Sequence, residues 1–147
     1  MGLAKVYQIV YIDTMAEAQE KKVILAVDDM AVSLTTIRTI LQHEYDVRLA
    51  KSATLALEML KQFKVDLILL DIEMPEISGL EFVGLLKKSP ELKSVPVIFV
   101  TSHANPQFID QAMAFEAEGY IVKPFIPDAL IKRVKSVIGE EDGESEA

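Results

Sequence analysis

Short apolar runs alternate with amphipathic stretches from Val23 onward, and this alternation is typical of β-α units around a parallel sheet. The third run is apolar throughout after its first residue, as expected for a strand buried on both faces of a sheet. The predicted strands are residues 23–27, 47–50, 66–70, 97–100 and 120–122. We therefore predict an α/β fold, a doubly wound sheet of five parallel strands.

Between the runs, apolar residues recur three or four positions apart, which predicts helices that cover the sheet. Asn105 is a suitable N-cap for one of them, and Pro106 follows at the favoured first position. The apolar positions are Leu34, Ile37, Ile40 and Leu41; Leu55, Leu57, Met59, Leu60 and Phe63; Phe82, Leu85 and Leu86; Phe108, Ala112, Met113 and Phe115; and Leu130, Ile131, Val134, Val137 and Ile138.

Charge and composition exclude several classes of function. The formal net charge is −8, but five of the 23 acids lie in the tail after Gly139; the rest of the chain holds 18 acids and 15 bases. Such a mildly acidic body argues against direct binding of nucleic acid. The chain has no cysteine, so disulfides and thiolate chemistry are excluded. No apolar run is long enough to span a membrane, and we expect a cytoplasmic protein.

The 147 residues fit one domain with two flanking segments. We expect a domain at residues 22–139, an N-terminal extension at 1–21 and an acidic disordered tail at 140–147. Within the extension, residues 6–12 form an apolar run that suits either a strand or a helix. The run is either a linker remnant or buried, against its own domain or in a second copy that would make a homodimer.

Polar residues follow the predicted strands at the points where those strands end. Asp28 and Asp29 follow the first strand, Asp71 the third, Thr101 the fourth and Lys123 the fifth. In an open parallel sheet, ligands bind beyond the carboxyl ends of the strands, so we expect these groups to converge. A single acid at a strand end often only caps a helix, whereas three together indicate a site.

Three carboxylates held close together repel one another, which implies a bound cation, a raised pKa or a partner base. Magnesium suits such oxygen ligands. Lys123 would add a positive charge toward a phosphate, and the Thr101 hydroxyl can donate a hydrogen bond to a phosphoryl oxygen. The set predicts phosphoryl transfer to Asp71.

Four segments together resemble a bacterial two-component response-regulator receiver domain of the single-domain, chemotaxis-regulator type. They are the Asp28-Asp29 pair, DLILLDIEMPEISGLE at residues 66–81, VTSH at 100–103 and GYIVKPF at 119–125. The resemblance covers about residues 22–139. It implies a flavodoxin-like fold with strand order 2-1-3-4-5.

The resemblance also assigns roles at the carboxylate cluster. It implies that Asp71 is the phosphorylated aspartate and that Asp29, Asp71 and the backbone carbonyl of Glu73 bind Mg²⁺ directly. Asp28 would act through a water molecule. Glu73 and His103 would flank the path of water to the phosphoryl group and slow its hydrolysis, unless both side chains merely point into solvent.

Three further residues take part in switching if the resemblance holds. Thr101 would be the switch hydroxyl, Lys123 the cation that pairs with the phosphate, and Tyr120 the aromatic residue whose rotamer reports activation. A cis peptide bond between Lys123 and Pro124 would aim the lysine, as in the family.

The implied function is a signalling module and not an enzyme that acts on other molecules. A sensor histidine kinase or histidine phosphotransfer protein donates phosphate to Asp71, the domain catalyses its own phosphorylation and dephosphorylation, and the altered surface binds a downstream protein target. One alternative is a magnesium-dependent phosphatase similar to the haloacid dehalogenases, with Asp71 as nucleophile and Glu73 as acid/base. That family, however, carries its pair of acids on the first strand. A flavin-binding protein would need a Ser/Thr-rich loop where Asp28 and Asp29 lie. A degenerate receiver used as a scaffold is the remaining alternative, against which the complete residue set argues.

Overall fold

The computed structural model describes residues 21–102 and 105–139. The apolar run 6–12, His103 and the acidic tail 140–147 therefore lie outside the described residues. In chain order the elements are β1 (Val23–Val27), α2 (Ala31–Leu41), β2 (Asp46–Ala50), α3 (Ala53–Leu60), β3 (Leu67–Asp71), α4 (Gly79–Lys87), β4 (Val97–Thr101), α5 (Pro106–Met113), β5 (Gly119–Val122) and α6 (Pro127–Ile138).

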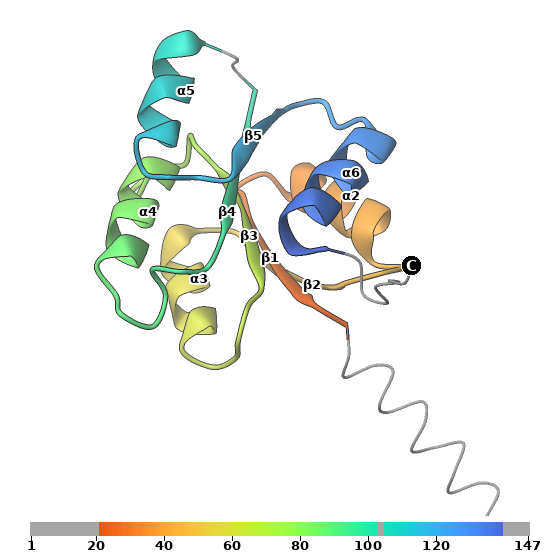
Figure 1. Ribbon diagram of the computed structural model, residues 1–147, viewed down its shortest axis with the longest axis horizontal. Helices are drawn as coiled ribbons and strands as arrows, with labels where there is room; N and C mark the ends of the chain where they lie inside the picture. Colours follow the sequence, from red (N-terminus) through yellow and green to blue (C-terminus); the bar gives the residue numbers. More distant parts are fainter. Residues whose placement is uncertain (1–20, 103–104, 140–147) are drawn as a thin grey trace, which may run out of the picture.

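The five strands form one parallel sheet in the order β2-β1-β3-β4-β5. Helices α2 and α6 cover one face, and α3, α4 and α5 cover the other (Figure 1). This arrangement confirms the doubly wound, flavodoxin-like fold. Within the described segments, no helix is both long enough and apolar enough to span a membrane.

The central strand β3 contributes side chains to both faces of the sheet, and all five of its residues are buried. Ile68 and Leu70 belong to the apolar cluster under α3, α4 and α5, whereas Leu67 and Leu69 belong to the cluster under α2 and α6. Successive side chains of a strand point to opposite faces, so a continuous apolar run is what this position requires.

Strand β1 has the predicted bounds, but β3 lies one residue later than predicted. Asp66 does not begin the strand; its Oδ2 atom accepts a hydrogen bond of 2.8 Å from the backbone N–H of Val23. Asp71 ends the strand and pairs with Val100 of β4. The backbone ladder continues through Asp71 because pairing uses main-chain groups and does not depend on an apolar side chain.

Capping side chains begin several helices. Asn105 caps α5 as predicted, accepting a hydrogen bond from the N–H of Gln107, with Pro106 in the first turn. Ser78 and Glu81 form a reciprocal capping box at the start of α4.

Three apolar residues that we expected to cover the sheet are instead exposed: Leu55, Leu85 and Met113.

Candidate functional site

The polar residues predicted to converge do lie together at the carboxyl edge of the sheet. Asp28 and Asp29 follow β1, Asp71 ends β3, Thr101 ends β4, and Lys123 follows β5. One ligand oxygen from each of the three aspartates lies within 4.8 Å of the others. The parallel register of neighbouring strands thus gathers residues from distant parts of the chain.

Burial distinguishes the carboxylates. Asp28 and Asp71 are 1% and 6% exposed, whereas Asp29 is open to solvent. Backbone N–H groups orient both buried carboxylates: Met30 donates to Asp28 Oδ1 at 2.9 Å, and Glu73 donates to Asp71 Oδ1 at 3.3 Å. The turns after β1 and β3 therefore fix the direction of these side chains.

Lys123 forms its shorter ion pair with Asp28 and not with Asp71. Its Nζ atom lies 2.8 Å from Asp28 Oδ2 and 3.9 Å from Asp71 Oδ2. The backbone N–H of Lys123 donates to the carbonyl of Thr101 at 2.8 Å, and the Lys123–Pro124 peptide bond is cis, as expected. The ammonium group therefore lies between two buried carboxylates.

The pKa of Asp71 is raised from 3.8 to about 7. Burial is the main cause, and the negative charge of Asp28 adds to it, while Lys123 and the Glu73 N–H act in the opposite direction. The sequence analysis expected a bound cation, a raised pKa or a partner base at three close carboxylates. The raised pKa of Asp71 and the basic partner Lys123 are both present.

The donor set also fits a small, hard cation. Three carboxylates offer oxygen atoms within 4.8 Å of one another, and such ligands are those that Mg²⁺ prefers. Asp28 Oδ2 is buried and, among the described residues, makes an ion pair but accepts no hydrogen bond of good geometry. This cluster has unused acceptor capacity.

Gly79 is a site residue that the sequence analysis treated only as part of a turn. A Cβ atom here would overlap the carbonyl oxygen of Asp71 and lie 2.9 Å from the Cα of Ile72. The Gly79 N–H donates to the Ile72 carbonyl at 2.8 Å. Only glycine allows the start of α4 to pack this closely against the end of β3. The S-x-x-E spacing of Ser78 and Glu81 was the signal that could have located this helix start.

The other predicted site residues lie farther out. Glu73 is exposed in the loop after β3, and Tyr120 is 36% exposed on the edge strand β5. Tyr120 pairs in register with Phe99, while Thr101 pairs with Val122. The placement of His103 is not described, so its predicted position beside the site stays a prediction.

A family model and several known proteins match this chain. A family model described as the response regulator receiver domain matches residues 24–135. The polar-differentiation response regulator DivK of Brucella ovis is 32% identical over 120 residues, which cover 81% of this chain and 98% of DivK. The solved structure of the chemotaxis response regulator CheY4 of Vibrio cholerae superposes with a TM-score of 0.75 at 30% identity, covering 80% of this chain and 98% of CheY4.

A longer relative contains a similar segment. A probable cyclic di-GMP phosphodiesterase of Vibrio cholerae is 40% identical over 113 residues, which are 76% of this chain. The chain spans only 25% of that relative's length, so the similarity extends to one segment of a larger protein.

Proposed function

The chain belongs to the response regulator receiver domain family, and we propose that residues 22–139 accept a phosphoryl group on Asp71. The observation that carries this proposal is the position of Asp71, buried beside Asp28, within 4.8 Å of the ligand oxygens of both other aspartates and 3.9 Å from Lys123. The phosphatase alternative has no support from the matched family or from the relatives.

In the proposed reaction, a carboxylate oxygen of Asp71 attacks the phosphorus atom of a phosphohistidine on a sensor kinase or phosphotransfer protein. The new P–O bond makes an acyl phosphate, and the P–N bond breaks with its electron pair left on the imidazole. The hydrogen bond from the Glu73 N–H orients the Asp71 carboxylate. Lys123 lies close enough to neutralise charge on the transferred group.

Magnesium is the proposed cofactor, held directly by Asp29, Asp71 and the backbone carbonyl of Glu73, with Asp28 acting through a water molecule. When bound, it supplies positive charge to the phosphoryl oxygens and to the carboxylates. Asp28 keeps its ion pair with Lys123 and so holds the lysine at the site.

We propose that the signal leaves the site through Thr101 and Tyr120. The Thr101 hydroxyl would donate a hydrogen bond to a phosphoryl oxygen, and its movement would let Tyr120 turn inward. Thr101 ends β4, and its backbone carbonyl accepts a hydrogen bond from the N–H of Lys123, the residue that follows β5. A movement of Thr101 is therefore transmitted to the end of β5. The surface of α5, β5 and α6 would then bind a downstream target.

Glu73 and His103 are proposed to set the lifetime of the phosphorylated state. A carboxylate at the exposed Glu73 lies beside a negative phosphoryl group, where it orients an attacking water poorly. Hydrolysis of the acyl phosphate is then slow, because the attacking water is poorly aligned.

Mass spectrometry after incubation with Mg²⁺ and acetyl phosphate tests the assignment. We expect one added phosphoryl group, labile to hydroxylamine, in the wild type and in the control Asp110→Ala, whose carboxylate is exposed on α5. Asp71→Ala should remain unmodified. A stable adduct in Asp71→Ala would overturn the assignment, and repeated turnover of small phosphoesters would support the phosphatase instead.

A further inference from the structure

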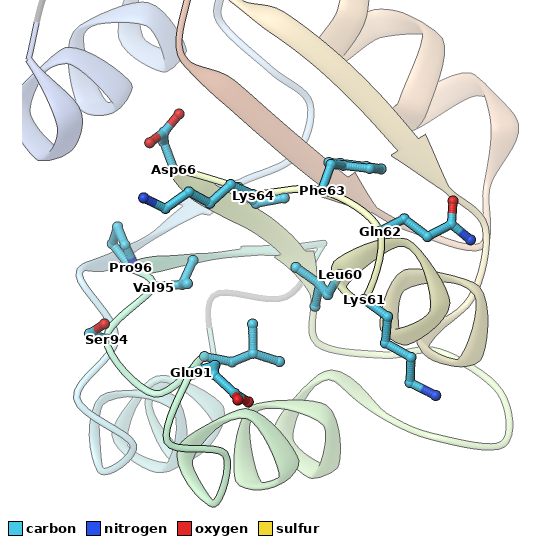
Figure 2. Close-up of a pocket in the computed structure, with 12 residues that line it drawn as sticks. Leu60, Lys61, Gln62, Phe63, Lys64, Asp66, Glu91, Ser94, Val95 and Pro96 are labelled. Atoms are coloured by element: carbon cyan, nitrogen blue, oxygen red, sulfur yellow. The ribbon is translucent and has the colours of Figure 1, made fainter.

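A groove of about 630 Å³ lies at the edge of the sheet opposite Asp71. The loop before β3 forms one wall and the loop before β4 forms the other (Figure 2). Six apolar residues line it: Leu60, Phe63, Val65, Leu92, Val95 and Pro96. Leu60 and Val65 are part of the buried core, and Phe63, Leu92 and Val95 are partly buried against it, so the groove is an open extension of the core.

The N-terminal chain enters the domain at the rim of this groove. The backbone N–H of Val23 donates a hydrogen bond to the side chain of Asp66, and Asp66 is one of the residues that line the groove. The carbonyl of Lys22 accepts a hydrogen bond of 2.9 Å from the N–H of Asp46, which fixes the last residue before β1. The point from which residues 1–21 leave the domain is therefore well defined.

The extension contains an apolar segment that matches the apolar lining of the groove. Residues 6–12, VYQIVYI, are apolar except for one glutamine. The groove volume falls within the range of about 300–1,000 Å³ that is usual for small-molecule binding pockets, whose lining is mostly apolar. Buried apolar surface on both partners would leave water together.

The length of the connecting residues 13–22 also fits. Ten residues span at most roughly 36 Å when extended and about 15 Å when helical, and the chain already starts at the rim. The connection carries Asp13, Glu17 and Glu20 but also Lys21 and Lys22, and the rim carries Lys61 and Lys64 but also Glu91, so charge gives no preference for or against the docking.

We propose that residues 6–12 of the same chain dock in this groove, so that the N-terminal extension completes the core at the edge opposite the phosphorylation site. A tether this short holds the segment near its own groove at a millimolar effective concentration, which favours the chain's own segment over that of a second copy. The inference is independent of the proposed phosphorylation, because it uses no residue of that site.

Disulfide trapping in the full chain tests the docking, since the sequence has no cysteine of its own. One variant combines Ile9→Cys with Ser94→Cys in the groove; the matched control combines Ile9→Cys with Ser136→Cys on α6, on the other face of the sheet. Both serines are exposed. We expect the groove pair to cross-link at least about tenfold faster than the control, at a rate unchanged by dilution.

A third variant adds Val10→Asp to the groove pair. It should cross-link no faster than the control, because burial of an unpaired carboxylate in an apolar groove is unfavourable. Equal rates in the groove and control pairs would overturn the proposal and leave the groove to another partner. A cross-linked dimer whose formation rises with protein concentration would also overturn it, since the occupant would then be a second copy.

Discussion

Replacing Asp71 with Asn should stabilise the metal-free protein at pH 8. In the folded state this carboxylate is buried beside Asp28, and its ionised form is unfavourable there. Asparagine has nearly the same shape and no charge. Lys123 keeps its 2.8 Å partner Asp28, so the substitution leaves no buried ammonium without a partner.

The size of the effect follows from proton linkage. The folded-state pKa is about 7 and the ordinary value is 3.8, so the folded protein binds more protons than the unfolded chain between these pH values. The free energy of unfolding of the wild type therefore falls as pH rises through this window and stays low above it. A difference of about three pKa units corresponds to a ceiling of about 4 kcal/mol.

Urea unfolding of wild type and Asp71→Asn in EDTA measures this difference. At pH 8 the variant should be more stable by at least about 2 kcal/mol and at most about 4 kcal/mol; at pH 4 the gain should shrink to about 0.5 kcal/mol. An equal gain at both pH values, or a less stable variant at pH 8, would refute the electrostatic reasoning. The exposed Asp110→Asn is the control and should stay within about 0.5 kcal/mol of wild type at each pH.

Three other outcomes are expected. Gly79→Ala should lower the free energy of unfolding by about 1–3 kcal/mol through overlap with the end of β3, whereas Gly84→Ala in the same helix should raise it by about 0.5–1 kcal/mol; urea unfolding compares the two. A beryllofluoride mimic should shift the amide resonances of residues 104–125, and unmoved resonances at full occupancy would contradict the switch. Phosphate loss should be faster in Glu73→Asn, and in its double mutant with His103→Glu, than in wild type; equal lifetimes would remove the tuning role.

The sheet could be predicted from the sequence because a strand buried on both faces needs a continuous apolar run. The run at β3 ends in polar Asp71, and the pattern therefore placed the strand one residue early. A hydrophobic pattern reports which side chains leave water, whereas the strand boundary is set by main-chain hydrogen bonds. Asp66 reads as the start of the strand by position, yet its side chain holds the Val23 N–H.

The convergence of the polar groups was also predictable, since parallel strands bring their carboxyl ends to one edge. The partner of Lys123 was not. Its ion pair with Asp28 is about 1 Å shorter than its contact with Asp71, and that difference depends on the geometry of the β5–α6 turn. The contact of Gly79 with the end of β3 is likewise tertiary, because it joins the start of α4 to a strand eight residues earlier.

Charge counting links the proposed cofactor to the proposed modification. With all three aspartates ionised, Lys123 balances one of three negative charges; burial, together with the charge of Asp28, already raises the pKa of Asp71. Phosphorylation would replace the single charge of Asp71 with about two. Lys123 alone does not balance the added negative charge. The phosphorylated state is therefore stabilised by a bound cation more than the unmodified state is. By reciprocal linkage, a phosphoryl group on Asp71 should strengthen Mg²⁺ binding, and Mg²⁺ should favour the phosphorylated state by the same factor.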